Sequence, residues 1–197
     1  MRPFDRRAVR RHRDRAATRV GAVADLLREL AKRLVGRLDE VNRRFALALD
    51  IGGRGVVAPL LRSRGIEVVS TDLSARMASL GGNLAVAADE EWLPFAPASF
   101  DLVVASLSLH WVNDLPGALI QLRQVLRPDG LLLASLPTLG TLGELRAALT
   151  AAEAALADGA APRVSPFPEL VDCARLLQRA ATLHRLGRDQ DRGGEEP

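Results

Sequence analysis

The chain has very few of the residues that build covalent or metal-centred sites. Cys173 is the single cysteine, which excludes an internal disulfide and a thiolate zinc site. The three histidines are scattered along the chain, so no metal site is expected. Long apolar runs are also missing. The longest uncharged run, residues 130–143, contains Pro137 and is too short to cross a bilayer.

Tyrosine is absent, and Lys32 is the single lysine, so 26 of the 27 basic residues are arginine. Against 24 acidic residues this leaves a net charge of +3. The pI of about 10.2 follows because few groups titrate above neutral pH, so a small positive excess persists. A nucleic-acid-binding domain needs a clustered basic face, and we therefore expect no nucleic-acid partner.

The one dense basic cluster lies at the N-terminus, where eight arginines stand between Arg2 and Arg19 against Asp5 and Asp14. We expect a solvent-exposed helical arm here. Contact with an acidic partner or a membrane surface is the alternative. The remaining composition, with 48% hydrophobic residues in 197, is typical of one globular domain, for which we expect a cytoplasmic location.

Helical and strand patterns alternate along the chain. Apolar residues recur at helical spacing from about residue 20 to 43. Short apolar runs then predict strands, and the segments between them predict helices. The predicted strands are 45–49, 66–71, 84–88, 100–106 and 131–136, and the later helices are 56–64, 74–80, 114–126, 141–157 and 169–180. This alternation predicts an α/β fold, with a doubly wound and mostly parallel sheet behind N-terminal helices.

Polar residues end the first four predicted strands: Asp50, Asp72, Asp89 and Ser106. In parallel sheets the carboxyl ends of the strands meet at one edge, and ligands bind there. This repeated placement predicts a ligand site at that edge.

A glycine-rich loop, Gly52-Gly-Arg-Gly55, follows the first strand and lets the backbone approach a ligand closely. Asp72 ends the next strand, where an acid accepts hydrogen bonds from ribose hydroxyls. The dinucleotide fingerprint fails, because Arg54 and Val57 stand where it needs glycine. The pattern therefore favours a nucleoside-bearing ligand without pyrophosphate.

Several motifs together resemble class I S-adenosylmethionine-dependent methyltransferases with a type 11 domain. They are Ala48-Leu-Asp-Ile-Gly52, Val69-Ser-Thr-Asp-Leu-Ser-Ala-Arg-Met77, Ala88-Asp-Glu-Glu-Trp-Leu-Pro-Phe95, Ser99-Phe-Asp-Leu-Val-Val104 and Leu126-Arg-Pro-Asp-Gly130. A narrower resemblance points to the branch that holds the malonyl-carrier-protein methyltransferase of biotin synthesis and a complex I assembly factor that hydroxylates arginine. It rests on Phe4-Asp-Arg-Arg7, Ser106-Leu-Ser-Leu-His-Trp-Val-Asn-Asp114, Thr141-Leu-Gly-Glu-Leu145 and Arg163-Val-Ser-Pro-Phe167, and the first and last of these favour the assembly-factor side.

The resemblance implies S-adenosylmethionine as cofactor and a role for each matching residue. Asp72 would hold the ribose hydroxyls, Asp89 the adenine amino group, and the Ser106 carbonyl the methionine ammonium. The implied cofactor-binding residues are Asp50, Gly52, Gly53, Gly55, Asp72, Leu73, Asp89, Glu90 and Ser106. His110 is a candidate base on the acceptor side, with a packed core position as its alternative.

The sequence departs from the family pattern at two points. In the family loop, D-x-G-x-G-x-G, either a residue is missing after Gly52 or Arg54 and Val56 replace glycines, and an arginine side chain here can intrude on the cofactor. After Ala180 no strand pattern is left, so we expect the last two strands of the family sheet to be missing through truncation or a shifted frame.

The expected organisation therefore has four parts. Residues 1–44 form the basic arm and amphipathic helix, 45–136 the S-adenosylmethionine-binding core with a Rossmann-like sheet in the order 3-2-1-4-5, 137–186 the C-terminal helices, and 187–197 a disordered tail. The expected function is methyl transfer to an unidentified small-molecule or protein acceptor. An arginine hydroxylase or assembly factor of the same fold is one alternative, and a non-catalytic binding remnant is the other.

Overall fold

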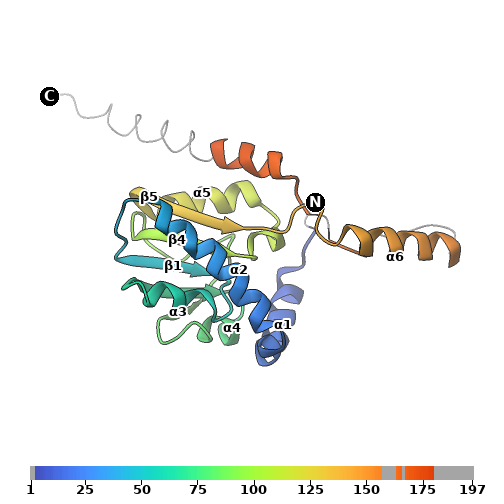
Figure 1. The fold of residues 1–197 in the computed structure, drawn as a ribbon, viewed down its shortest axis with the longest axis horizontal. Helices are drawn as coiled ribbons and strands as arrows, with labels where there is room; N and C mark the ends of the chain where they lie inside the picture. The colour runs from blue at the N-terminus through green and yellow to red at the C-terminus, as the bar shows by residue number, and fades with distance from the viewer. Residues whose placement is uncertain (1–2, 157–162, 166, 180–197) are drawn as a thin grey trace.

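The computed structural model of the chain describes residues 3–156, 163–165 and 167–179. Its centre is a five-stranded parallel sheet in the order β3-β2-β1-β4-β5 (Figure 1). The strands are β1 (Leu47–Ile51), β2 (Glu67–Asp72), β3 (Ala85–Ala87), β4 (Phe100–Ser106) and β5 (Leu126–Ser135). The predicted Rossmann-like fold and strand order are confirmed. The segment after Ala180 and the predicted disordered tail lie outside the described residues.

Six helices surround or extend from this sheet in the described part of the chain. They are α1 (Arg6–Ala16), α2 (Ala24–Gly36), α3 (Val57–Arg62), α4 (Ala75–Ser79), α5 (Leu115–Val125) and α6 (Gly143–Leu156), and residues 170–179 are also helical. The single helix predicted over 20–43 is instead α2 between two 3₁₀ segments, Ala17–Val23 and Arg37–Glu40. Helix α6 buries no residue and points away from the sheet (Figure 1).

Both faces of the sheet are covered, which explains why its strands are apolar throughout. Successive side chains of a strand point to opposite faces, so Ala48 of β1 joins a cluster with α2 and α3, and Leu49 joins a cluster with α5. In β4, Leu102 and Val103 divide between the two clusters in the same way. The clusters fix the sheet between its helices and hold the strand ends in place.

Strand β5 begins earlier than predicted. The segment 127–130 was expected to be a turn before the strand, but Leu126 already pairs with Phe100 of β4. The register then shifts before Leu131 pairs with Leu102, and Asp129 takes a left-handed φ of 62° within this irregular stretch. The turn residues are therefore an irregularity inside the strand. Helices long and apolar enough to span a membrane do not occur among the described residues.

Candidate cofactor-binding site

The carboxyl ends of the strands bring the predicted polar residues to one edge of the sheet. Asp50 lies near the carboxyl end of β1. It pairs with Ser70 of β2 on one side and with Val104 of β4 on the other. Asp72, Asp50 and Ser106 are all almost fully buried, with exposed fractions of 1%, 1% and 3%. Asp89 follows β3 on the same edge. The strand pattern thus predicted which side chains would be neighbours.

The glycine loop lies flat against the neighbouring segments. The Gly52 N–H donates to the Thr71 carbonyl at 2.8 Å, and Gly52 has a φ of +65°. A Cβ on Gly52 would lie 2.6 Å from the Cβ of Ser108, and one on Gly53 would lie 2.1 Å from Asp50 Oδ1. Both positions therefore exclude any side chain.

Asp50 lies beneath this loop. Its Oδ2 accepts a hydrogen bond from Ser70 Oγ at 3.4 Å, and its Oδ1 has no hydrogen-bond partner. Burial raises the pKa of Asp50 to about 7, against the smaller opposing effects of the Ser70 hydrogen bond and the Arg54 charge. Because Gly53 covers the carboxylate, Asp50 supports the loop from below.

Arg54 turns its side chain back into the site. Its guanidinium donates to the carbonyls of Gly52 at 2.8 Å, Ser106 at 3.0 Å and Leu107 at 2.7 Å. Its backbone has a φ of +50°, which favours glycine. Burial, and then the charge of Arg13, lower the pKa of Arg54 to about 10. The Arg54 side chain thus contacts the Ser106 carbonyl, which the family resemblance assigns to the cofactor.

Helix α1 brings a second arginine to Asp72. Arg13 Nη1 donates to Asp72 Oδ2 at 2.5 Å, while Asp72 Oδ1 accepts from the Ser74 N–H at 2.9 Å. Ser74 in turn donates to Asp14 of α1 at 2.5 Å and caps α4. Asp72 is thus held by the N-terminus of α4 on one side and by α1 on the other.

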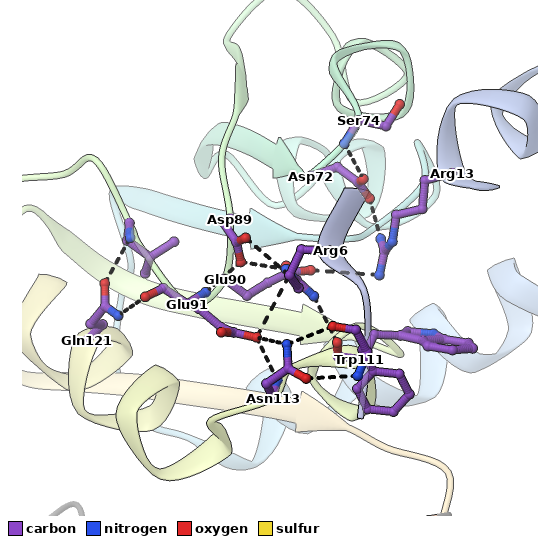
Figure 2. Close-up of polar contacts among 12 residues, drawn as sticks. Arg6, Arg13, Asp72, Ser74, Asp89, Glu90, Glu91, Trp111, Asn113 and Gln121 are labelled. Atoms are coloured by element: carbon purple, nitrogen blue, oxygen red, sulfur yellow. Dashed lines mark hydrogen bonds and ion pairs between the residues drawn. The ribbon is translucent and has the colours of Figure 1, made fainter. Parts of the chain in front are cut away.

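A third arginine, Arg6, reaches the acids after β3 (Figure 2). Its Nε donates to Asp89 Oδ2 at 3.1 Å, and its Nη2 pairs with Asp89 Oδ1 at 2.5 Å and also with Glu90. Burial alone would lower the pKa of Arg6, but the Asp89 hydrogen bond and the Glu90 charge outweigh it and raise the pKa above its usual range. Arg13 Nη2 lies 3.7 Å from Glu90 Oε1, so the two arginines share this carboxylate.

From its composition we expected the N-terminal arm to be solvent-exposed. The structure shows instead that part of it is buried against the sheet edge. Arg13 is 7% exposed, and the acidic surface that α1 meets belongs to the same chain. Sequence reasoning missed the roles of Arg6 and Arg13. One signal was present: they are seven residues apart, two helical turns, and so lie on one face of α1.

A polar network beside Arg6 ties the N-terminal segment to the loop after β4. Asn113 donates to Glu91 and exchanges hydrogen bonds with the backbone of Phe4, at 2.8 and 3.1 Å (Figure 2). The Phe4 and Trp111 rings meet edge to face, with centroids 5.4 Å apart. The start of the chain is thus fixed to the core just before Arg6.

His110 lies beside Trp111 and Phe167, with ring centroids 5.2 and 5.8 Å away. Burial, and then the charges of Arg54 and Arg13, lower its pKa to about 4, so the ring is neutral at pH 7. His110 also lines a cleft of about 1220 Å³ between the N-terminal helices and the sheet edge, which Arg54 and Leu107 line too. The ring contacts support a packed position for His110, and the cleft supports a position on the acceptor side, so both interpretations from the sequence remain open.

The hydrogen-bond acceptors at the edge fit the cofactor that the sequence implies. Carboxylates and a carbonyl suit ribose hydroxyls, an adenine amino group and an ammonium. Three buried polar atoms of this region have no hydrogen-bond partner, namely Asp50 Oδ1, Thr71 Oγ1 and Ser108 Oγ, and Glu90 Oε1 has only the Arg13 cation at 3.7 Å. Buried polar atoms are normally hydrogen-bonded, so these atoms indicate a polar ligand. Among the described residues, no cluster of histidine, cysteine and acidic side chains could hold a metal ion.

The fold is the Rossmann-like fold of methyltransferases. Residues 49–134 match the family model described as a methyltransferase domain. A SAM-dependent methyltransferase of Thermotoga maritima has the same fold, with a TM-score of 0.61 at 18% identity over 85% of this chain and 78% of that one.

Curated relatives lie in the branch that the narrower resemblance indicates. The chain is 42% identical over 189 residues to "Arginine-hydroxylase NDUFAF5, mitochondrial" of Danio rerio, covering 91% of this chain and 59% of the relative. It is 37% identical over 196 residues to "Malonyl-[acyl-carrier protein] O-methyltransferase" of Methylovorus sp. strain MP688, covering 90% and 64%. The chain thus spans somewhat more than half the length of these relatives.

Proposed function

We propose that this chain binds S-adenosylmethionine and transfers its methyl group to an acceptor in the cleft beside His110. The observation that carries the proposal is the row of acceptors at the carboxyl edge of a methyltransferase-family sheet. In this proposal Asp72 binds the ribose, Asp89 the adenine amino group, and the Ser106 carbonyl the methionine ammonium. Gly52, Gly53, Gly55, Leu73 and the Glu90 backbone line the same site.

The cofactor supplies an electrophilic methyl group, and the chain supplies alignment. Methyl transfer to a good nucleophile needs the two reacting groups in line, so positioning provides much of the rate. The neutral ring of His110 faces the cleft and has a buried Nδ1 without a partner. In this proposal that nitrogen accepts a hydrogen bond from the acceptor and orients it.

A second candidate function rests on the identity to the arginine hydroxylase of Danio rerio. Arginine hydroxylation would use the same fold and the same site as methyl transfer, so cofactor binding does not distinguish the two candidate functions. The product does: incubation with a candidate acceptor protein, followed by mass spectrometry, shows either an added methyl group or an added oxygen atom. A cytoplasmic location, and contact of the exposed arginines with a membrane or acidic partner, stay predictions from the sequence.

Ligand choice tests the cofactor. We expect S-adenosylhomocysteine to raise the melting temperature in a thermal-shift assay and NAD to leave it unchanged, because Arg54 and Val57 stand where a dinucleotide loop needs glycine. Stabilisation by NAD alone would overturn the proposal.

Asp72→Ala tests the site. We expect S-adenosylhomocysteine binding to weaken by roughly 1.5–3 kcal/mol in calorimetry, the scale of lost hydrogen bonds to a charged acceptor. Glu67→Ala is the matched control, because Glu67 is an exposed acid at the opposite end of the same strand. Equal affinities of Asp72→Ala and the natural chain would remove Asp72 from the site.

A further inference from the structure

The acceptors that the proposed function gives to the cofactor already hold three arginines of this chain. Arg54 donates to the Ser106 carbonyl at 3.0 Å, Arg13 to Asp72 at 2.5 Å, and Arg6 to Asp89 at 3.1 Å. Each guanidinium thus stands where one part of the cofactor would bind: the ammonium, the ribose and the adenine. The three contacts come from two separate segments, helix α1 and the glycine loop.

These contacts leave little room for a ligand beside the arginines. The Arg13 side chain is 9% exposed and that of Asp72 is 1% exposed, so a ribose reaches Asp72 only after Arg13 moves. The Arg54 guanidinium covers three carbonyls of the site at once. The arginines and the cofactor are therefore competitors for the same atoms.

Few apolar contacts hold helix α1 in this position, so the helix can be displaced. Arg13 is its single buried residue, Arg6 reaches the same acidic edge, and the remaining arginines of the helix are exposed, so ion pairs rather than an apolar core hold it in place. Buried ion pairs contribute little net stability, because the lost hydration of both charges offsets their attraction. Figure 2 shows Arg6 surrounded by carboxylates that would otherwise lie open at the sheet edge.

We propose that α1 and Arg54 form an internal gate: Arg6, Arg13 and Arg54 occupy the cofactor's acceptors in the free chain, and ligand binding displaces them. The proposal rests on the proposed function and adds a conformational step to it. The apparent affinity for the ligand is then the intrinsic affinity multiplied by the fraction of chains in which the gate is open. Each arginine should also act on a different part of the ligand.

Arg54→Gly tests the loop half of the gate. Glycine readily adopts the φ of +50° at this position, so the variant removes the cation without straining the loop. We expect S-adenosylhomocysteine to bind about tenfold more tightly in calorimetry, and adenosine affinity to stay unchanged, because Arg54 covers only the ammonium position.

The pair Arg6→Gln and Arg13→Gln tests the helix half. We expect both S-adenosylhomocysteine and adenosine to bind about tenfold more tightly, because these arginines cover the ribose and adenine positions. Arg7→Gln with Arg10→Gln is the matched control: it removes the same charge from exposed positions of the same helix. The control should bind both ligands as the natural chain does.

Hydrogen–deuterium exchange on the natural chain tests the displacement directly and needs no variant. We expect S-adenosylhomocysteine to speed exchange in residues 6–16, because the helix leaves its site. Protection of these residues on binding would overturn the gate, as would weaker or unchanged binding by both sets of variants. If the natural chain binds and the variants bind no better, the proposed function stands and the gate falls. If neither the natural chain nor any variant binds S-adenosylhomocysteine, both fall.

Discussion

At the scale of single residues, Asp50 shows how burial sets chemistry. Its carboxylate lies under Gly53, and burial raises its pKa to about 7. A carboxyl whose pKa is raised by folding holds its proton more tightly in the folded state. Its contribution to stability is therefore full below the unfolded pKa of about 3.8 and is lost as the pH rises to about 7.

Asp50→Asn removes this titration. We expect the variant to gain melting temperature relative to the natural chain between pH 5 and pH 8.5, by at least about 3 °C, since 1 kcal/mol shifts a chain of this size by about 2–4 °C. The measurement is ligand-free calorimetric unfolding at both pH values. A constant difference between the two proteins would show that Asp50 keeps an ordinary pKa.

Arg54 shows how a single side chain changes the contacts within a site. Its guanidinium makes three hydrogen bonds to backbone carbonyls, those of Gly52, Ser106 and Leu107. At this departure from the family loop pattern, Arg54 ties the loop to the end of β4 through the Ser106 carbonyl.

At the scale of elements, the glycine loop is fixed by its contact with α4. Gly55 has a φ of +78°, and a Cβ there would lie 2.8 Å from the Leu80 carbonyl oxygen at the end of α4. Gly65 has nearly the same φ, +77°, but a Cβ there would meet nothing within 4 Å. The two glycines therefore share a left-handed backbone conformation, which would strain any other residue, but differ in steric room.

Gly55→Ala and Gly65→Ala separate the two effects. We expect Gly65→Ala to cost about 1 kcal/mol of unfolding free energy from strain alone. Gly55→Ala should cost roughly 1–3 kcal/mol more, because the loop and α4 must also move apart. Chemical denaturation measures both, and equal losses would mean that the Leu80 contact does not hold the loop.

At the scale of the whole molecule, β5 is the sheet edge in the described part of the chain. Residues 131–136 carry no charge and no proline, and natural edges usually carry one or the other. Leu176 packs against the apolar cluster on the α5 side of the sheet, but among the described residues β5 pairs with β4 alone, and no strand pairs with its outer side. An uncharged edge of this kind favours pairing with another copy.

We therefore expect self-association that rises with concentration in sedimentation velocity. Ala134→Lys should reduce it, because Ala134 is exposed in β5 and a charge there opposes edge pairing. Ala152→Lys on α6 adds the same charge away from the edge and should leave association unchanged. A natural chain that stays monomeric at all concentrations would contradict this expectation.

The sequence by itself determined the sheet, its strand order and the edge where the polar residues gather. Strand and helix periodicity are local properties, and parallel strands must end on the same edge. Asp50, Asp72 and Ser106 therefore met as predicted. The family loop pattern also indicated that Arg54 could enter the site.

The tertiary structure alone decided which arginines meet which acids. Arg13 and Asp72 are 59 residues apart, and Arg6 and Asp89 are 83 apart. The arginine-rich composition led us to expect a helical arm that holds Arg6 and Arg13, but it could not show that this helix packs over the sheet edge. The burial of Arg13 follows from that packing, because a buried charged side chain is stable only when it is paired with an opposite charge, here Asp72.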